Sequence, residues 1–596
     1  MGWTIDDSKA IHGIGSGDMD FLDIDKEGNL VITIEDQTIT VKEILDRLRN
    51  DYDITNGHKL PSFTLRLPQL IGKQIEKILT AFDQAFQKYA YKGTFDPLYP
   101  IKVNQQKQEI NTVVESSPKY GLEAGTKAEL FLILQQLKDQ KNRTIVCNGV
   151  KDHEYIGIIN QALRDGYTVF VSIESVEELV ICTDHIDLNN LNLIFRMKPY
   201  VKIAGYWGST SGRNSKFGLS IDDLMQAIAF LEKNNQKRLL RGIHAHPGSQ
   251  ISDFPSLTRY IKFLVATFEQ LHLQGFENLN IIDFGGGMPI RYESENNVRL
   301  IFEYADAIVQ NVVEMCVRRN IDHPSIMTES GRFITASSSM AIIQVLNYYE
   351  LFPKGKEKQQ EIKKKIQEKV HSVEDAENFW KELDSKNYAD TDFAKLHDFE
   401  TSYGVAKEEL RKHLMKYGSK MLSNEILKRI YTANYLLLGN FSIFNSACDH
   451  VMVGQYFPVF EVENLHLQPD TLSRLVDITC DSDGEISIFR LKKHDKDLFT
   501  KDGFPLTSAD QHYIKGFPTT MNTNVRSKYI AIPLIGAYQD IIELDHNLIG
   551  DLPDVQILLK DDKTWEVEVT THAQPIYDLL KRVGYHLDID KTSYIT

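Results

Sequence analysis

The sequence predicts an α/β fold with an added β part: a (β/α)8 barrel, a second β-rich domain (a β-barrel or sandwich) and an inserted helical subdomain. Three observations predict the barrel. From about residue 98, short apolar runs alternate with helical patterns. About eight such units fit within roughly 250 residues, the usual size of a β/α barrel. The unusual residues lie at or just past the C-terminal ends of the runs, where barrel enzymes carry their active sites. A doubly wound open sheet is the structural alternative.

Each predicted barrel strand is a short apolar run, and most are followed by a helical pattern. The predicted strands span residues 98–103, 120–123, 144–148, 168–173, 192–197, 241–245, 280–284 and 325–328. Helical patterns fill most intervals, for example at 127–137, 154–164, 221–233 and 256–271. This alternation favours parallel strands joined by crossover helices.

The segments on either side of the barrel follow other patterns. Before it, we expect strands at 29–34 and 60–67, a helix at 41–48 and an amphipathic helix at 72–91. After it, residues 354–375 are strongly charged and 379–427 keep a helical period, which indicates an inserted, solvated helical subdomain. The tail has predicted strands at 451–462, 475–479, 486–491, 529–534, 555–559 and 565–570. The expected domains are 1–70 (N-terminal strands, part of the β-rich domain), 71–350 (barrel), 351–430 (helical insert) and 431–596 (C-terminal β-rich domain).

The composition sets limits on the class of protein. With 596 residues the chain is too long for one hydrophobic core. The formal net charge of −16 argues against non-specific binding to nucleic acid or to anionic membranes. The five cysteines are scattered and form no CxxC pair, so neither a disulfide framework nor a zinc site is predicted. The start of the chain lacks a signal-peptide pattern and no apolar run approaches transmembrane length, so we expect a cytoplasmic protein.

A single lysine, Lys102, stands among apolar residues at the end of the first predicted barrel strand, in Tyr-Pro-Ile-Lys-Val-Asn-Gln-Gln (99–106). Ammonium groups are rarely buried unless they are paired or used. Burial lowers the pKa of a lysine and frees its amine as a nucleophile, so we interpret Lys102 as a Schiff-base lysine for an aldehyde cofactor. The alternative is a lysine at a strand end that extends its ammonium to solvent.

Two further motifs follow predicted strands. Asp-Phe-Gly-Gly-Gly-Met (283–288) has three glycines that allow backbone N–H groups to approach an anion, and the alternative is a tight βα turn. In His-Ala-His-Pro-Gly-Ser-Gln (244–250), a histidine could stack on an aromatic cofactor and Ser249 could bind a phosphate oxygen. The two histidines could instead be metal ligands or structural residues, although we expect them to point to opposite faces of the strand.

Charged and polar groups also end the last barrel strand and occur in the β-rich tail. Glu329 and Arg332 could simply pair, or Arg332 could bind a phosphate while Glu329 pairs with a protonated ring nitrogen. In Thr-Cys-Asp-Ser-Asp-Gly (479–484), the two carboxylates disfavour ionisation of Cys480, which suits a proton donor. The acids could equally be turn residues. Gly-Ala-Tyr-Gln-Asp (536–540) offers the phenol of Tyr538.

Taken together, these motifs resemble the biosynthetic arginine decarboxylase family, in the family's order and from about residue 50 to about 560. Besides the lysine motif, the resemblance is carried by Gly-Leu-Glu-Ala-Gly (121–125), Cys-Asn-Gly (147–149), Ser-Lys-Phe-Gly-Leu (215–219), His-x-His-x-Gly-Ser-Gln (244–250), Glu-Ser-Gly-Arg (329–332), Asn-Phe-Ser-Ile-Phe-Asn-Ser (440–446), Thr-Cys-Asp-Ser-Asp-Gly (479–484) and Gly-Ala-Tyr-Gln (536–539). Where the family more often has Phe-His-Leu-Gly-Ser, this chain has Ala-His-Pro-Gly-Ser (245–249). Where the family usually has Leu-Gly-Val-Asp-Tyr-Asp, it has Met-Pro-Ile-Arg-Tyr-Glu (288–293).

The resemblance implies a pyridoxal-phosphate enzyme with an alanine-racemase-like barrel and a β-domain. It implies that Lys102 holds the cofactor aldehyde, that His246 stacks on the ring and that Glu329 lies at the pyridine nitrogen. The implied phosphate-binding residues are Ser249, Gly285, Gly286, Gly287, Arg332 and Tyr538. The implied substrate segment is Phe284, Met288, Pro289, Ile290, Arg291, Tyr292, Glu293 and Ser294.

The resemblance further implies decarboxylation of L-arginine to agmatine and CO2, the first step of a route to putrescine and spermidine. Cys480 would reprotonate Cα, and Asp481 or Asp483 would pair with the guanidinium. The family implies magnesium and a homo-dimer or tetramer in which Cys480 and Asp481 reach across to the other subunit. The rival functions are decarboxylation of another basic amino acid (ornithine, lysine or carboxynorspermidine) and a non-catalytic regulatory role.

Overall fold

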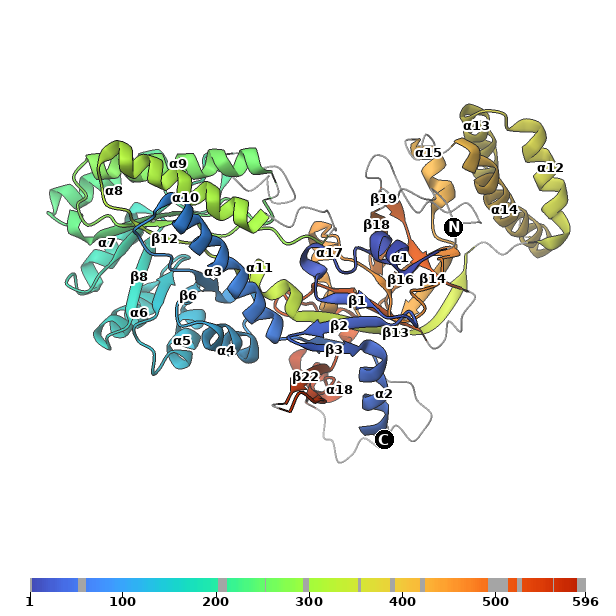
Figure 1. Cartoon of the computed structure of the whole chain (residues 1–596), viewed down its shortest axis with the longest axis horizontal. Coiled ribbons are helices and arrows are strands. Elements are labelled where there is room, and N and C mark those ends of the chain that lie inside the picture. The colour runs from blue at the N-terminus through green and yellow to red at the C-terminus, as the bar shows by residue number, and fades with distance from the viewer. Residues whose placement is uncertain are drawn as a thin grey trace.

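The computed structural model describes residues 3–51, 61–201, 212–251, 253–292, 300–351, 355–385, 392–417, 424–490, 513–521, 528–560 and 562–586. Figure 1 shows a helix-wrapped barrel, a body of sheets beside it and a group of helices that projects from the far end of that body. No helix in the described part of the chain is both long and apolar enough to cross a membrane.

The barrel is a parallel sheet whose strands follow one another in chain order. Within the described residues the sheet has eight strands, β5 to β12, at Leu98–Pro100, Gly121–Ala124, Thr144–Cys147, Thr168–Ile173, Leu193–Met197, Leu240–Ala245, Ile281–Asp283 and Ser325–Met327. Its first and last strands meet, because the Leu98 N–H donates to the Thr328 carbonyl at 2.8 Å and Leu98 forms a parallel bridge with Glu329. A barrel is therefore confirmed over the open-sheet alternative.

Helices cover the outside of the barrel. They are α4 to α10 at Lys107–Ser116, Lys127–Gln136, His153–Arg164, Val176–His185, Ile221–Lys233, Phe254–Leu273 and Leu300–Arg319, together with α3 at Gln69–Tyr89, which packs on α10. In α3 the buried residues Ile71, Ile75, Ile78 and Phe82 recur at helical spacing and form one apolar stripe. The start of α8 is fixed by a capping box, in which the Ser220 hydroxyl accepts from the Asp223 N–H and the Asp223 carboxylate accepts from the Ser220 N–H.

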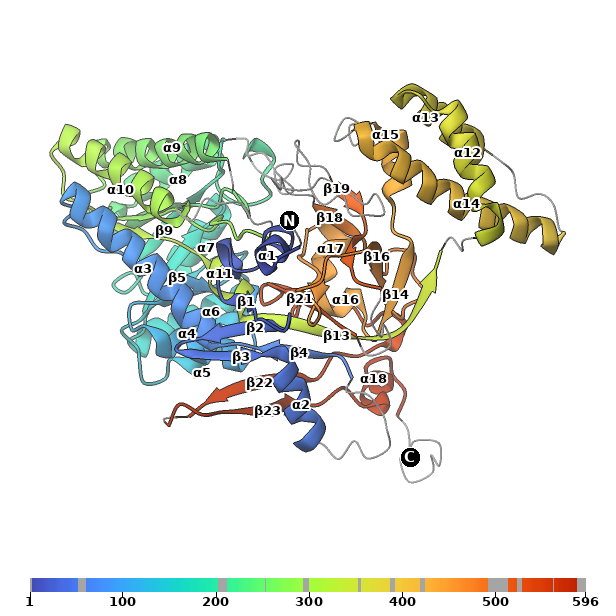
Figure 2. The same ribbon diagram turned by 45° about the vertical axis from the view of Figure 1, so that its right-hand side comes forward.

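The second body is built on a mixed sheet of ten strands in the described part of the chain. The strands are β4 at Phe63–Arg66, β13 at Ser339–Glu350, β14 at Tyr435–Gly439, β15 at Phe460–Glu461, β16 at Thr471–Val476, β17 at Glu485–Ile486, β20 at Phe517–Thr519, β21 at Tyr529–Pro533, β22 at Asp554–Leu559 and β23 at Trp565–Thr571. β4 lies between β13 and β22 (Figure 2), so an N-terminal strand shares a sheet with strands of the C-terminal part. The domain boundaries themselves stay a prediction.

Smaller elements complete the molecule. β1, β2 and β3 at Leu22–Ile24, Leu30–Ile34 and Gln37–Thr40 form an antiparallel sheet, with α1 at Ile5–His12 before it and α2 at Val41–Asp51 after it. β18 at Ile488–Arg490 pairs with β19 at Tyr513–Lys515. Short helices occur as α11 at Gly331–Thr335, α15 at Glu425–Lys428, α16 at Ile443–Ser446, α17 at Cys448–Val453 and α18 at Ile576–Arg582.

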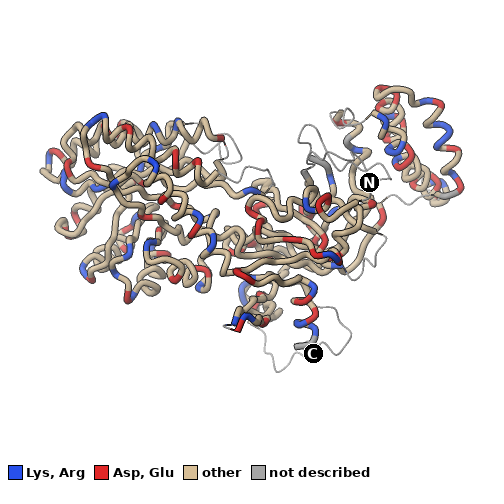
Figure 3. Tube along the Cα trace, viewed as in Figure 1, with Lys and Arg blue, Asp and Glu red and all other residues tan. Residues whose placement is uncertain are grey.

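The projecting group is the predicted helical insert. Its helices are α12 at Gln359–Lys369, α13 at Val373–Asp384 and α14 at Phe393–Leu414. Lysine, arginine and acidic residues are interspersed along them (Figure 3), including the i,i+4 ion pair between Lys365 and Glu361 at 2.6 Å. Trp380 is almost fully buried within the group, so the insert has an apolar contact of its own.

One predicted element is wrong. The apolar run at 451–462 was expected to be a strand, but its start belongs to helix α17 and only Phe460–Glu461 is strand. A short apolar run has no periodicity that separates a strand from a buried helical turn, and the Gly454 C-cap in the left-handed region ends the helix here. The predicted strand 486–491 is two short strands, and residue 491 lies outside the described residues, as does residue 60 at the start of the 60–67 prediction.

Candidate active site

A cavity of about 600 Å³ lies at the C-terminal ends of the barrel strands, and a pocket of about 50 Å³ adjoins it. Five residues, Lys102, His246, Ser249, Arg332 and Tyr538, line both. The smaller pocket also takes in Gly286, Gly287 and Glu329. Except for Gly285, the residues expected to bind the cofactor therefore surround one pocket, although they come from both ends of the chain.

Lys102 lies in a 3-10 turn, Ile101–Val103, directly after β5. Its Nζ is 3.3 Å from Glu123 Oε2, and its side chain stays 38% exposed because it stands in the open cavity. Burial lowers the pKa of the Lys102 ammonium, but the charges of Glu123 and Glu329 outweigh burial and the net pKa is raised. The sequence-based expectation of a lowered pKa is therefore wrong for the chain alone. The reason is that the Glu123 carboxylate pairs with the Lys102 ammonium and favours its charged form.

Two residues that the sequence reasoning did not assign to the site connect Lys102 to Glu329. Asn148 follows β7, and its amide nitrogen donates to Glu123 Oε1 at 2.9 Å and to Glu329 Oε1 at 2.8 Å. Burial raises the pKa of Glu123, and the Lys102 ammonium opposes that rise. Glu123 lies near the C-terminal end of β6 and Asn148 directly follows β7, and that position was the available signal.

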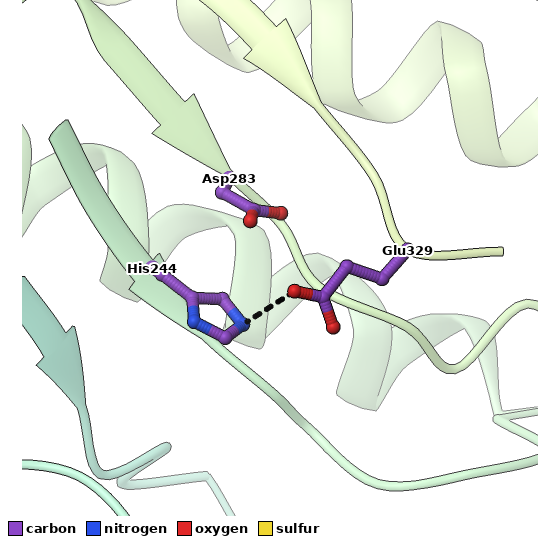
Figure 4. Close-up of side chains that lie close together, drawn as sticks. All are labelled: His244, Asp283 and Glu329. Carbon is purple, nitrogen blue, oxygen red and sulfur yellow. Dashed lines mark ion pairs between the residues drawn. The ribbon is translucent and has the colours of Figure 1, made fainter. Parts of the chain in front are cut away.

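His244, Asp283 and Glu329 form a buried cluster (Figure 4), which is linked to Asn148 through Glu329. His244 lies one residue before the end of β10, Asp283 ends β11 and Glu329 follows β12, and one ligand atom of each lies within 4.8 Å of the others. His244 Nε2 is 3.6 Å from Glu329 Oε1. Burial holds the pKa of His244 well below its ordinary value and the pKa of Asp283 well above, so both groups favour the neutral form. A mixed histidine and carboxylate set does not match Mg²⁺, which prefers oxygen ligands in octahedral geometry.

The imidazoles of both histidines in the 244–250 motif approach the glycine loop after β11. A Cβ placed on Gly285 would lie 3.2 Å from His244 Nε2, and one placed on Gly286 would lie 3.1 Å from His246 Nε2. The expectation that they point to opposite faces is wrong, because residues two apart along a strand share a face. Burial, with the charge of Lys102, keeps the pKa of His246 well below its ordinary value, so its imidazole is neutral.

The glycine loop after β11 is shaped by close packing. Gly285 has φ +60° and its N–H donates to Asp283 Oδ1 at 2.8 Å. A Cβ on Gly287 would lie 2.6 Å from Ile251 Cδ1, so the backbone here approaches its neighbours more closely than a side chain would permit. Gly286 and Gly287 line the smaller pocket.

Arg332 supplies positive charge to the same pocket. Its Nε donates to Ser249 Oγ at 3.2 Å and one terminal nitrogen donates to the Tyr292 hydroxyl at 3.0 Å. The other terminal nitrogen is 3.7 Å from Asp449 Oδ2, and the guanidinium lies 4.7 Å from the centroid of the Tyr538 ring. A guanidinium held on several sides is suited to binding a phosphate.

Arg196 and Asp449 also line the larger cavity and were missed. Arg196 forms an ion pair with Glu174 at 2.7 Å and its guanidinium lies 4.9 Å from the Phe217 ring centroid. The available signal was a charged residue inside the apolar strand β9. Nothing in the sequence singled out Asp449, which reaches the cavity from the short helix α17 in the second body.

The described part of the predicted substrate segment, residues 284 and 288–292, does not line the larger cavity of its own chain. Of the described residues of that cavity, none comes from 284–292, and Met288 lines only the smaller pocket. Phe284, Ile290 and Tyr292 are buried, and the Arg291 N–H donates to Asp18 Oδ2 at 2.7 Å. Pro289 is partly buried. Glu293 and Ser294 lie outside the described residues. The substrate role of this segment stays a prediction.

The comparisons with known proteins agree with this geometry. Residues 73–336 match the family model described as "Pyridoxal-dependent decarboxylase, pyridoxal binding domain". The biosynthetic arginine decarboxylase of Phocaeicola vulgatus is 30% identical over 618 residues, which cover 98% of this chain and 92% of the relative. This chain belongs to the biosynthetic arginine decarboxylase family.

Other members and their structures extend the likeness. The Yersinia pestis biosynthetic arginine decarboxylase is 28% identical over 599 residues, covering 94% of this chain and 86% of the relative. The crystal structure of the Campylobacter jejuni biosynthetic arginine decarboxylase superposes with a TM-score of 0.72 at 26% identity, over 97% of this chain and 92% of that one. A diaminopimelate decarboxylase from M. jannaschii shares the fold at 15% identity, with a TM-score of 0.60 and coverage of 94% and 97%.

In this arginine decarboxylase family member, the motif at 479–484 lies outside the cavity. Cys480 is exposed and its N–H donates to Asn547 Oδ1 at 3.0 Å. The Asp483 N–H donates to Asp481 Oδ1 at 2.9 Å, as in an Asx turn. Of the described residues that line the two cavities, none belongs to this motif. One chain alone therefore does not bring Cys480, Asp481 or Asp483 to Lys102, and their catalytic and substrate roles stay predictions.

Proposed function

We propose that this chain is a pyridoxal-phosphate-dependent decarboxylase that converts L-arginine to agmatine and CO2, as the first step of a polyamine route. The observation that carries the proposal is the match to biosynthetic arginine decarboxylases over nearly the whole chain. The pocket adds to it, because the residues expected around the cofactor gather there with Lys102 at its edge.

The residues present fit pyridoxal phosphate. Glu329 Oε2 is buried and has no hydrogen-bond partner among the described residues, so an acceptor is available for a protonated ring nitrogen. Arg332 and Ser249 face the smaller pocket beside Gly286 and Gly287, which suits a phosphate group. Lys102 would hold the aldehyde carbon and His246 would cover one face of the ring. Tyr538 would complete the phosphate site.

The positions of these residues indicate what each would contribute to the reaction. When bound, pyridoxal phosphate supplies an aldehyde that captures the α-amine of an amino acid and a protonated ring that draws electron density from Cα. Glu329, held by Asn148, keeps a proton at the ring nitrogen. Glu123 is the carboxylate nearest the Lys102 amine and is placed to take its proton. The neutral imidazole of His246 adds no charge against a cationic ring.

Several finer assignments rest on the resemblance. Cys480 would deliver the proton to Cα, and Asp481 or Asp483 would pair with the substrate guanidinium. Because these residues lie outside the cavity of their own chain, we assign them to the active site of the other subunit in a homo-dimer or tetramer. A cytoplasmic location and a magnesium requirement belong to the same proposal, and no catalytic step above depends on magnesium.

Product analysis tests the proposal. The purified chain is incubated with pyridoxal phosphate and L-arginine, and agmatine and CO2 are measured. Lys102→Ala serves as the control that retains the fold and loses the reactive amine. We expect agmatine from the wild type alone. Release of CO2 from ornithine, lysine or carboxynorspermidine in preference to arginine would overturn the substrate assignment, and no release from any of these would overturn the decarboxylase assignment.

A further inference from the structure

Two turns that are far apart in sequence meet beside the cavity. The first contains Lys102 and ends at Asn104, and the second, residues 536–540, contains Tyr538. The Tyr538 N–H donates to the Val103 carbonyl at 2.8 Å. The Asn104 amide donates to the Gly536 carbonyl at 3.0 Å, across a separation of 432 residues. The turn that carries the barrel lysine and the turn that carries the tyrosine of the second body are thus joined by two hydrogen bonds.

Asp540 joins this contact to a buried arginine. The Asn104 amide also donates to Asp540 Oδ2 at 3.0 Å. Arg66, on strand β4, donates to the same carboxylate from both terminal nitrogens, at 2.6 Å to Oδ2 and 3.1 Å to Oδ1. The side chains of Arg66 and Asp540 are 6% and 13% exposed, so this bidentate pair is largely shielded from water.

The side chain of Arg66 is itself fixed by hydrogen bonds to two neighbouring strands of the sheet. Arg66 Nε donates to Asp554 Oδ1 at 2.7 Å, and one terminal nitrogen donates to Ser339 Oγ at 3.0 Å. Ser339 and Asp554 belong to β13 and β22, the strands on either side of β4. Asp540 is therefore held to an interior strand of the sheet, and it in turn restrains the turn that carries Tyr538.

Both turns need such support. Tyr538 has φ +72°, a left-handed conformation that costs a residue with a side chain about 1 kcal/mol or more. A Cβ on Gly536 would lie 2.0 Å from the Thr335 carbonyl oxygen, so this turn packs closely against the end of α11. Asn104 uses every amide group it has, because its Oδ1 also accepts from the Gln106 N–H at 3.0 Å.

We propose that Asn104, Asp540 and Arg66 form a clasp that sets the distance between Lys102 and Tyr538, so that one cofactor molecule can engage both. None of the three lines the cavity, so they are positioning residues rather than catalytic ones. The inference rests on the proposed function, since it takes pyridoxal phosphate as the group that Lys102 and Tyr538 share. β4, an N-terminal strand between β13 and β22, brings Arg66 to Asp540.

The test measures cofactor affinity in variants of the clasp. Asn104→Ala removes the amide and leaves the Arg66–Asp540 pair intact, and Asp540→Asn weakens both contacts with almost no change of volume. The matched control is Asn445→Ala. The Asn445 amide also donates to a carbonyl, that of Ile549 at 2.9 Å, and to an aspartate, Asp551, at 3.4 Å, but it touches neither turn. The dissociation constant for pyridoxal phosphate is read from quenching of intrinsic fluorescence, and the melting temperature of each chain is read without cofactor.

We expect Asn104→Ala and Asp540→Asn to raise the dissociation constant roughly tenfold, the factor expected for one lost hydrogen bond to a charged group. The double variant should be no worse than the weaker-binding single variant, because both remove the same link. Asn445→Ala should stay within about twofold of the wild type, whatever its melting temperature.

Equal affinity in the clasp variants and the wild type would overturn the inference, as would equal losses in Asn445→Ala. Hydrogen exchange on the unmodified chain adds a test that does not depend on folding of a variant. Addition of pyridoxal phosphate should slow exchange in residues 101–104 and 536–540 together, and protection of only one turn would contradict the clasp. If the wild type itself does not bind pyridoxal phosphate, the proposed function fails instead.

Discussion

Glu109 is a buried acid that should make the stability of this protein depend on pH. It lies on α4, the helix that follows the Lys102 turn, and is 2% exposed. Burial raises its pKa from 4.5 to about 7, with the charge of Arg66 opposing that rise and the charge of Asp540 adding to it. Its Oε2 has no hydrogen-bond partner among the described residues.

The direction in which stability changes with pH follows from whether the folded or the unfolded chain binds the proton. Between pH 4.5 and about 7 the folded chain keeps a proton on Glu109 that the unfolded chain has lost, so stability falls as the pH rises through that window. At about 1.36 kcal/mol per pKa unit, ionising this buried group costs about 3 kcal/mol above pH 8 and less than about 1 kcal/mol at pH 5. Glu109→Gln removes the titration.

The assay compares melting temperatures of the wild type and Glu109→Gln at pH 5 and pH 8. The difference between the two chains should grow in favour of the variant by about 2 to 3 kcal/mol between these pH values, or about 2 °C for cooperative unfolding of a chain of this length. Glu115→Gln is the matched control, because Glu115 is exposed on the same helix and its replacement should leave the difference unchanged. A Glu109→Gln difference that is the same at both pH values would refute the reasoning.

Three other predictions concern the cavity. Arg332→Met should weaken binding of pyridoxal phosphate by roughly 10- to 100-fold in a fluorescence titration, since it removes the guanidinium beside Ser249 and Tyr538; unchanged affinity would remove Arg332 from the phosphate site. Glu123→Gln should shift covalent uptake of the cofactor to lower pH, followed by absorbance, because the Glu123 carboxylate helps to raise the pKa of Lys102; an unshifted profile would contradict the pairing. Cys480→Ala should lower kcat by about 100-fold or more, because it removes the proposed proton donor. The dissociation constant for pyridoxal phosphate should stay the same, because Cys480 lies outside the cofactor pocket of its own chain. A kcat equal to that of the wild type would exclude Cys480 as the proton donor.

The barrel and its cofactor residues were predictable for a physical reason. In a parallel barrel, each strand must end on the same face, so Lys102, His246 and Glu329 could be placed together from the positions of their strands alone. The residue types in the motifs, three consecutive glycines in one and an acid with an arginine in the other, then distinguished the glycine loop and Arg332 from ordinary turns. The pKa of Lys102 was not predictable in the same way, because it depends on a carboxylate, Glu123, whose distance only the fold determines.

The contribution of the second body was harder to foresee. Asp449 and the Arg66–Asp540 pair reach the site through contacts between segments hundreds of residues apart, and no local pattern encodes such a contact. The run at 451–462 shows the same limit at short range, since tertiary packing turned its start into a helix. Cys480 lies outside the two cavities of its own chain, and the sequence of one chain does not place the second subunit to whose active site we assign it.

The central claim is that the amine of Lys102 is the covalent attachment point for pyridoxal phosphate. The most direct measurement is to incubate the chain with the cofactor, reduce it with borohydride, digest it and locate the pyridoxyl group by mass spectrometry. We expect a single major adduct on the peptide that contains Lys102, absent from Lys102→Ala. An adduct on another lysine, or the same labelling in Lys102→Ala, would contradict it.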